Sequence, residues 1–249
     1  MMLSVVIIAK DAALTLPNCL KSIKRLACEV IVVVDSRSRD ETVEIAKATG
    51  ARVFKRKFDN FAAQKNFGLT KAGGEWVLAL DADEEISVQL AEEIARVLPL
   101  TSATAFKIAR LNYIWGKAMS HTDWDPQTDT HVWLWKRGSG QWVGNVHEEV
   151  VVLGKIDHLQ GYKIHHNYQS VEQFLDKMNQ YTTLEAQNRT FSLPLLFIYP
   201  VWKFIRHYII YQGFLDGWHG LALSYLMAIY GLAIYIKAWE KKSLSSLSF

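Results

Sequence analysis

The sequence predicts an α/β protein with a mostly parallel sheet and helices on both faces of that sheet. Three apolar runs rich in β-branched residues, at 4–8, 29–35 and 75–81, have the composition of strands that are buried on both faces. Segments with helical patterns separate these runs, and this alternation predicts right-handed crossovers in a doubly wound sheet. Ligands of such sheets bind at the carboxyl ends of the strands, so those ends are the places to search for a site.

The expected helices are marked by their ends. Thr15 and Pro17 open the first helix, because proline is favoured in a first turn. The second follows "SRDE" at 38–41, which has the Ser-x-x-Glu spacing of a capping box, and Gly50 closes it. A third helix is expected within 61–74, where the segment ends at a pair of glycines.

The pattern changes after residue 100. Short strands are expected at 105–111, 131–136 and 148–153, as an antiparallel extension that completes one wall of a cleft. A helix is expected over 170–190, with Ser170 as its N-cap. The chain is thus divided into a ligand-binding half at 1–98, a second half of the same domain at 99–190, and a tail at 191–249.

The tail is apolar and rich in Tyr and Trp, with interspersed basic residues. This composition favours a helical hairpin in the headgroup region of an anionic leaflet, and core helices or a membrane span are the alternatives. The N-terminus resembles a strand and not a signal peptide, so we expect a peripheral or monotopic protein on the cytoplasmic face of the inner membrane. The basic residues of the tail are Lys203, Arg206, Lys237, Lys241 and Lys242.

Composition excludes some classes. A net charge of +3 gives no basis for nucleic-acid binding, and 21% charged residues with 50% hydrophobic residues give no sign of disorder. The two cysteines, Cys19 and Cys28, have neither metal-site spacing nor a disulfide framework, which indicates a reducing compartment.

Acidic residues follow the third apolar run directly, in "LALDADEEIS" at 79–88. The carboxylates of Asp81 and Asp83, two residues apart on a loop, can point to one spot, and hard oxygen ligands suit Mg²⁺ or Mn²⁺. Such an ion can hold a diphosphate and stabilise its charge as it leaves. The alternative is that Asp81 and Asp83 cap a following helix, with Glu84 and Glu85 in its first turn.

Several motifs in one order carry a resemblance. "SVVIIAKDAALTLPNCLKSI", "EVIVVVDSRSRDETVEIAKATGARV" and "FAAQKNFGLTKAGGEWVLALDADEEIS" resemble the family-two glycosyltransferases. "VGNVHEEV" and "KIHHNYQSVEQFLDKMNQYT" extend the match to about residue 190. The tail is similar to that of the lipopolysaccharide inner-core branch, which includes β-1,4-glucosyltransferases. The resemblance implies a GT-A fold, with its Rossmann-like, mostly parallel sheet, and a UDP-sugar donor.

The resemblance also implies roles for individual residues. Asp35 matches an aspartate that contacts the uracil and ribose, Lys65 matches a basic position near the diphosphate, and Asp83 matches the direct metal ligand. Asp81 matches a carboxylate that contacts the ribose or metal-bound water. Ala9, Lys10 and Asp11 line the end of the first strand near the base. Taken alone, Asp35 could be a turn residue and Lys65 a solvated helix residue.

A second motif, "VGNVHEEV" at 143–150, supplies candidates for the acceptor side. Inverting transfer needs a carboxylate that takes the proton of the acceptor hydroxyl, and Glu148 is the candidate base. Glu149 and Asp125 are its rivals, and an exposed hairpin is the alternative without a function. His147 is expected to coordinate the metal, contact the diphosphate or orient Glu148.

One departure from the family pattern concerns the loop after the second strand. The family usually has Asp-Ser-Gly-Ser-Thr-Asp there, whereas this chain has "DSRSRD", with Arg37 and Arg39. These arginines are either solvated or in contact with an anionic donor or lipid headgroup.

The hypothesis that follows is an inverting, metal-dependent transferase that moves a hexose, with glucose expected, from a UDP-sugar to a lipid-linked saccharide such as the lipopolysaccharide inner core. A polyprenyl-phosphate sugar synthase and a non-catalytic nucleotide-binding membrane module are the alternatives. A nucleotidyltransferase is disfavoured, because "AKDAALTLPN" has no glycine-rich phosphate loop.

Overall fold

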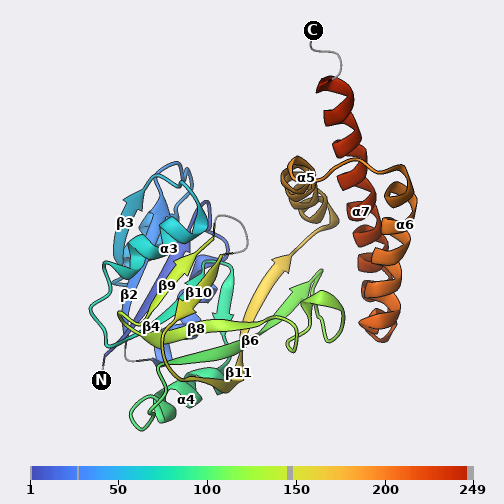
Figure 1. Ribbon diagram of the computed structural model, residues 1–249. Coiled ribbons are helices and arrows are strands. Elements are labelled where there is room, and N and C mark those ends of the chain that lie inside the picture. The colour runs from blue at the N-terminus through green and yellow to red at the C-terminus, as the bar shows by residue number, and fades with distance from the viewer. Residues whose placement is uncertain (1, 27, 145–147, 246–249) are drawn as a thin grey trace. The chain divides into compact units, whose positions relative to one another are not determined.

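The computed structural model describes residues 2–26, 28–144 and 148–245 (Figure 1). The chain forms two compact units. The first comprises 1–111 and 129–165, and the second comprises 112–128 and 166–249. The three-part division expected from the sequence assigns segments by their role, and it stays a prediction.

The first unit begins with three crossover connections that build a parallel sheet. Strands β1 (Leu3–Ala9), β2 (Cys28–Asp35), β3 (Arg52–Arg56) and β4 (Trp76–Asp81) pair in the order β3-β2-β1-β4, all parallel. Every residue of β1 is buried, as a strand covered on both faces requires. The α/β class and the strands expected at 4–8, 29–35 and 75–81 are confirmed.

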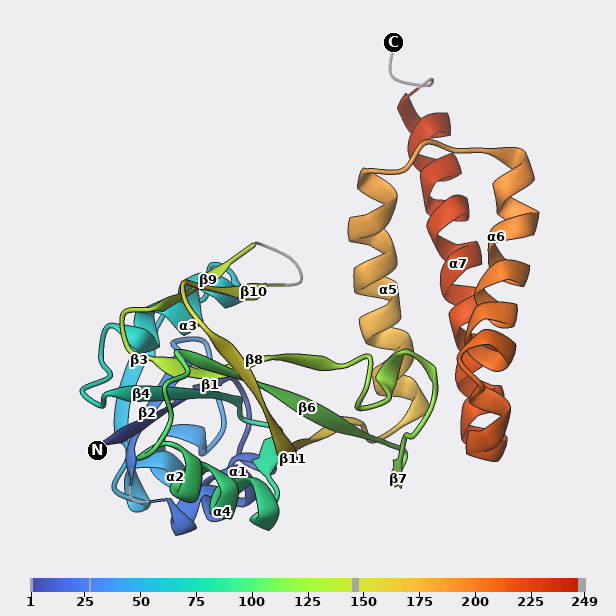
Figure 2. The ribbon, with the colours of Figure 1, turned by 60° about the horizontal axis from the view of Figure 1, so that its bottom comes forward.

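Helices cover both faces of this sheet. Figure 2 shows α1 (Leu16–Ser22), α2 (Thr42–Ala48) and α4 (Val88–Val97) on one face and α3 (Phe61–Leu69) on the other. A short 3-10 helix, η1 (Ile23–Arg25), follows α1. The expected capping box is wrong, because α2 begins only at Thr42 and Ser38 instead accepts a hydrogen bond from the backbone N–H of Asp11. Gly50, at φ +82°, closes α2 as expected.

An antiparallel extension completes the sheet, as the sequence predicts. Its strands are β5 (Glu84–Ile86), β6 (Ala105–Ile114), β8 (Thr130–Lys136) and β11 (Ile156–Tyr168), and β7 (Lys117–Ala118) pairs with β6. The order continues from β4 through β8, β6 and β11 to β5. A separate two-stranded sheet is formed by β9 (Gly140–Val143) and β10 (Glu149–Val152).

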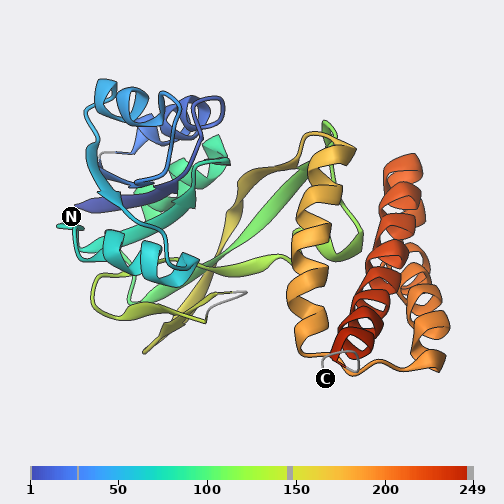
Figure 3. The same cartoon turned by 90° about the horizontal axis from the view of Figure 1, so that it is seen from above.

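The second unit is built on three helices, α5 (Val171–Gln187), α6 (Leu193–Ile205) and α7 (Gly217–Ser245). Helix α7 contacts both α5 and α6, and Figure 3 shows the three helices side by side. Ser170 caps α5 as expected, because its hydroxyl accepts the backbone N–H of Gln173 at 3.2 Å. A π-helix, η3 (Arg206–Ile210), and two 3-10 helices, η2 (Thr122–Trp124) and η4 (Gly213–Asp216), complete the unit.

Candidate active site

The carboxyl ends of the parallel strands bring three of the expected residues to one edge of the sheet. Ala9, Asp35 and Asp81 are the last residues of β1, β2 and β4. The register pairs Ala9 with Val34 and Ile8 with Asp81, so the three strands end at the same level. Asp83 follows two residues beyond Asp81. The sheet therefore gathers at one edge residues that lie up to 74 positions apart in the sequence.

Lys65 joins two carboxylates at this edge. Its ammonium lies 3.1 Å from Oδ1 of Asp81 and 2.9 Å from Oε1 of Glu148. The Lys65 side chain is only 5% exposed, and its Nζ lies 4.5 Å from the ring centroid of Trp142. Lys65 is thus a buried bridging cation, and the alternative of a solvated helix residue is wrong.

The charge of Lys65 is maintained by its partners. Burial by itself lowers the pKa of Lys65, but Asp81 and Glu148 more than offset that effect and raise the pKa above its ordinary value. The ammonium therefore offsets the repulsion between the two carboxylates.

Asn66 helps to position Glu148 beside Lys65 by binding the strand β9 to helix α3. Its side-chain amide donates to the backbone oxygen of Trp142 at 2.8 Å and accepts the backbone N–H of the same residue at 3.0 Å. These two bonds fix β9 against α3, and β10, which begins at Glu149, pairs with β9. His147, expected to work beside Glu148, lies outside the described residues.

A second polar cluster holds the acidic segment at 81–85 in place. Glu84 is fully buried, accepts the backbone N–H of Asp81 at 2.8 Å, and lies 2.6 Å from Nζ of Lys163. The guanidinium of Arg110 lies 3.4 Å from the other carboxylate oxygen of Glu84. Burial by itself raises the pKa of Glu84, but Lys163 and Arg110 more than offset this, so its pKa is lowered. Glu84 and Glu85 belong to β5, so the alternative that places them in a helical first turn is wrong.

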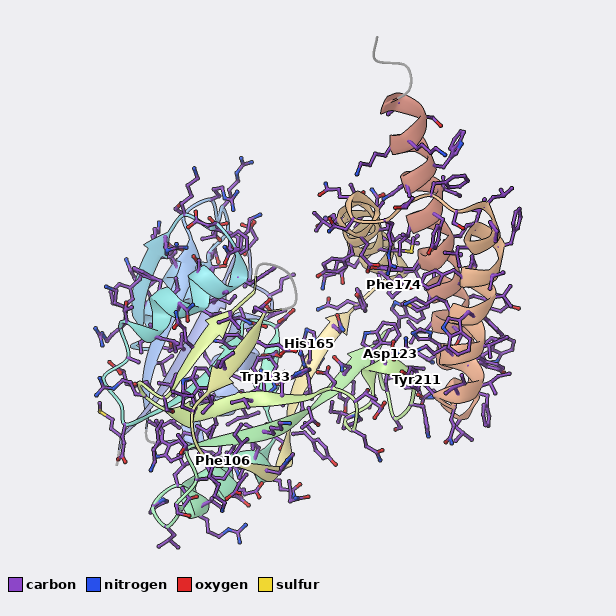
Figure 4. All side chains as sticks on the ribbon, viewed as in Figure 1. Phe106, Asp123, Trp133, His165, Phe174 and Tyr211 are labelled. Atoms are coloured by element: carbon purple, nitrogen blue, oxygen red, sulfur yellow. The ribbon has the colours of Figure 1, made fainter. Side chains whose placement is uncertain are left out.

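His165 is a residue that the sequence reasoning missed. Its Nε2 lies 3.5 Å from Oδ2 of Asp83, and Figure 4 shows its side chain on β11. The register of β11 against β5 pairs His165 with Glu84 and Lys163 with Ile86, so the two basic residues share one face of the strand. The signal in the sequence was the alternation of basic and apolar residues in "YKIHH", which is typical of a strand. It gains meaning only when β11 is known to pair with β5.

The loop after β2 contains an ion pair formed by Arg37, one of the two arginines that depart from the family pattern. Nε and Nη2 of Arg37 donate to both carboxylate oxygens of Asp35, with Nη2 at 2.7 Å from Oδ2. The Arg37 hydrogen bonds lower the pKa of Asp35 to about 2. Arg37 therefore pairs with the residue expected at the uracil, while its side chain stays 55% exposed to solvent.

The loop after β1 is fixed to the loop after β2. Asp11 has φ +46°, and its Oδ1 accepts the backbone N–H of Arg39 at 2.8 Å. Lys10, beside it, is exposed. The carboxylate of Asp11 thus has a structural partner at the same edge as Asp35, and its contact with a base stays a prediction.

Asp125, the rival base, belongs to the second unit. Its carboxylate accepts the backbone N–H of Gln127 at 2.7 Å, the backbone N–H of Thr128 at 3.1 Å and the hydroxyl of Thr128 at 2.8 Å. These bonds hold the turn that Asp125 begins. The Asp125 carboxylate thus has a structural role in this turn, and the choice between Glu148 and Asp125 as the base stays a prediction.

The donor set for a metal is small. Among the described residues, no group of three or more His, Cys, Asp or Glu side chains is arranged to hold an ion. Asp83 and His165 are two adjacent metal-ligand side chains, one carboxylate and one imidazole, near the carboxyl ends of the parallel strands. They fit a divalent ion that takes its other ligands from a diphosphate and water.

The second unit has an unusual surface. Within 193–236, all of which the structure describes, the exposed residues are apolar or aromatic apart from Gln212 and Gly217, and the partly buried Arg206 has a side chain that is 39% exposed. The large apolar side chains include Phe197, Trp202 and Trp218, of which Trp218 is 82% exposed. In the described part of the chain, one helical segment, 213–244, is apolar and long enough to cross a membrane, a test that core helices also pass.

Two basic residues of the tail, Lys237 and Lys241, bind the neighbouring helix α5. Nζ of Lys237 donates to Oδ1 and to the backbone oxygen of Asn179, both at 2.7 Å, and Nζ of Lys241 donates to the backbone oxygen of Gln187 at 2.7 Å. These two lysines bind α5, and their expected place among lipid headgroups stays a prediction. Lys203 and Arg206 lie on α6 and η3 instead.

Parallel strands that end in carboxylates and a buried lysine define an α/β protein of the nucleotide-binding, GT-A-like kind. The model of glycosyl transferase family 2 matches residues 4–140, and the chain belongs to this family. It is a glycosyltransferase.

Relatives agree with this assignment. An uncharacterized glycosyltransferase of Rickettsia typhi is 30% identical over 244 residues, which cover 91% of this chain and 82% of that protein. A PGL/p-HBAD biosynthesis glycosyltransferase of Mycobacterium bovis is 35% identical over 104 residues, covering 39% of this chain and 40% of that protein. The crystal structure of S. aureus TarS 1-349 in complex with UDP has the same fold, with a TM-score of 0.50 at 12% identity, over 98% of this chain and 92% of that one.

Proposed function

We propose that this chain is an inverting glycosyltransferase that transfers a hexose, glucose in the first instance, from a UDP-sugar to a lipid-linked saccharide such as the lipopolysaccharide inner core. The observation that carries the proposal is the Lys65 bridge between Asp81 and Glu148 at the carboxyl edge of the sheet. It places a candidate base and a fixed positive charge beside the strand ends where ligands of such sheets bind. The S. aureus TarS structure, of the same fold, holds UDP.

The chemistry assigned to Glu148 follows from its geometry. Lys65 donates to Oε1, so Oε2 is the oxygen that takes the proton of the acceptor hydroxyl. The hydroxyl oxygen then bonds to the anomeric carbon as the bond from that carbon to the diphosphate breaks, and UDP leaves with the bonding electrons. The new bond forms on the face opposite the leaving group, which inverts the anomeric configuration.

The remaining residues hold the donor. Asp35 with Arg37, together with Ala9, Lys10 and Asp11, forms the base side, and Asp81 faces the ribose. Asp83 and His165 would hold Mg²⁺ or Mn²⁺, which supplies positive charge to the diphosphate when it is bound. The buried pair of Glu84 and Lys163 keeps the acidic loop in place through the backbone N–H of Asp81.

The acceptor class rests on the surface of the second unit. A mainly apolar, aromatic surface over α6 and the start of α7 suits the boundary between headgroups and acyl chains of a leaflet. Docking there would turn a search for a lipid-linked acceptor from three dimensions into two. We assign the cytoplasmic face, because the sequence has only two cysteines, Cys19 and Cys28, and no disulfide framework, as is typical of a reducing compartment.

The experiment is release of UDP from UDP-glucose by the full chain with Mn²⁺ and a lipid-linked core saccharide. Transfer that needs both the acceptor and the ion, and that falls to background in Asp83→Ala, is the expected result. Full activity of Asp83→Ala after chelation would contradict the metal assignment. No UDP release with any common UDP-sugar would contradict the donor class.

A further inference from the structure

Lys203 on α6 is a half-buried cation whose ammonium contacts two aromatic rings in the described part of the chain. Its Nζ lies 5.7 Å from the ring centroid of Tyr199 and 5.6 Å from that of Tyr230. Among the described residues, no side-chain hydrogen bond or ion pair engages this ammonium, in contrast to Lys237, which binds α5. Aromatic faces stabilise a cation only in part, so the ammonium retains the capacity to donate to an anion.

Arg206 is three residues further along the chain, so its side chain lies on the same side of the helix. Nε of Arg206 donates to the hydroxyl of Tyr211 at 2.9 Å, and its guanidinium lies 4.9 Å from the centroid of that ring. The nearest carboxylate is Asp123, with Oδ1 at 3.8 Å from Nη2, and Figure 4 shows Asp123 and Tyr211 near each other. The Arg206 side chain is 39% exposed, so part of its donor fork reaches solvent.

The electrostatics of this cluster favour a further anion. Burial lowers the pKa of Lys203, and Arg206 and Arg189 lower it further, while Asp123 and Glu185 compensate only in part. Asp123 is already engaged by Nε2 of His207 at 2.9 Å, and Glu185 accepts a hydrogen bond from the hydroxyl of Tyr230. Each carboxylate thus has another hydrogen-bond donor, and among the described residues neither carboxylate forms a hydrogen bond with the ammonium of Lys203.

The surroundings indicate what kind of anion. Lys203 and Arg206 are the cationic side chains of the segment 193–210, apart from buried His207, and the residues of that segment that are exposed as a whole are all apolar. Cations at the edge of an apolar helical face fit the level of lipid phosphates, with the apolar residues among the acyl chains.

We propose that Lys203 and Arg206, framed by Tyr199, Tyr211 and Tyr230, form a binding site for the phosphate of an anionic lipid headgroup in the leaflet on which the enzyme acts. The ligand class is a phosphate diester without a compensating cation, as in phosphatidylglycerol. This inference rests on the membrane docking in the proposed function, and it adds a defined site to that surface.

The test is flotation of the full chain with phosphatidylcholine vesicles, with and without phosphatidylglycerol. Lys203→Met keeps the length and the apolar stem of the side chain and removes its charge. We expect its binding to phosphatidylglycerol vesicles to fall by about fivefold, the contribution of one basic residue near an anionic surface, with binding to phosphatidylcholine unchanged. Lys203→Arg should restore binding, and Lys24→Met, which removes an exposed charge from η1, should have no effect.

The outcomes separate the two proposals. Wild-type binding to both vesicles with no loss in Lys203→Met overturns the phosphate site and leaves membrane docking intact. A wild-type chain that binds neither vesicle overturns the docking, and the site with it, while transfer to a soluble acceptor is unaffected. A loss that Lys24→Met shares equally overturns the site, because it would reflect net charge alone.

Discussion

The assignment of Glu148 as the base predicts that Glu148→Gln removes most of the activity while the fold is kept. The amide oxygen of Gln can still accept the Lys65 hydrogen bond at the position that Oε1 occupies, 2.9 Å from Nζ. Lys65, 5% exposed, also retains Asp81 at 3.1 Å, so its charge is not left without a partner. We therefore expect the free energy of unfolding to fall by only about 1 kcal/mol, the difference between a charge-assisted and a neutral hydrogen bond.

The effect on the chemical step should be larger. An amide cannot accept the proton of the acceptor hydroxyl, and general bases contribute roughly 10²–10⁴-fold to rate. This corresponds to about 3–5 kcal/mol of transition-state stabilisation, so the loss of activity exceeds what a loss of folded protein could cause. The assay is the initial rate of UDP release at saturating donor and acceptor, with the Kd for UDP measured by calorimetry on the same samples.

The neighbouring residue supplies the control. Glu149→Gln changes the same chemical group on the exposed side of β10 and should keep activity within a few-fold of wild type. A Glu148→Gln enzyme with nearly full activity would refute the assignment, and with a phosphorylated lipid acceptor it would favour the polyprenyl-phosphate alternative. Equal losses in the two variants would also refute it.

Three further substitutions test the contacts around the site. Arg37→Gly should raise the pKa of Asp35 from about 2 towards its ordinary value. In the wild type this pair stabilises the fold above about pH 4, and the stabilisation is lost as pH falls towards 2. Free energies of unfolding from urea denaturation across that pH range should show this loss in the wild type and not in the variant. Lys163→Met leaves the buried Glu84 with Arg110, at 3.4 Å, as its remaining cation, and should lower the free energy of unfolding by up to about 3–5 kcal/mol. If Lys163→Met with Glu84→Gln does not recover stability, the pair is not the cause. Asp216→Asn weakens the bonds that the buried Asp216 carboxylate accepts from two backbone N–H groups of the 117–124 loop, and it should lower stability by about 1–3 kcal/mol; an unchanged melting temperature in calorimetry would contradict this.

The parallel half of the fold could be predicted because its signals are local. Continuous apolar runs mark β1, β2 and β4, and the position of Asp81 at the end of such a run places it at the ligand edge. The N-cap at Ser170 was readable for the same reason, since a cap depends on residues within one turn. The capping box at 38–41 failed because Ser38 bonds to a loop 27 residues away, which a local pattern does not register.

The sequence by itself determined which residues end the parallel strands, and therefore where Asp35, Asp81 and Asp83 gather, because strand order and burial follow from runs of a few residues. The tertiary structure alone decided their partners. Lys65 meets Glu148 across 83 positions, and His165 meets Asp83 across a strand pairing that nothing local specifies. The physical reason is that strand register and helix packing decide which residues, far apart in the sequence, become neighbours. A charge that is buried there must have a partner, because a desolvated charge without one is very costly.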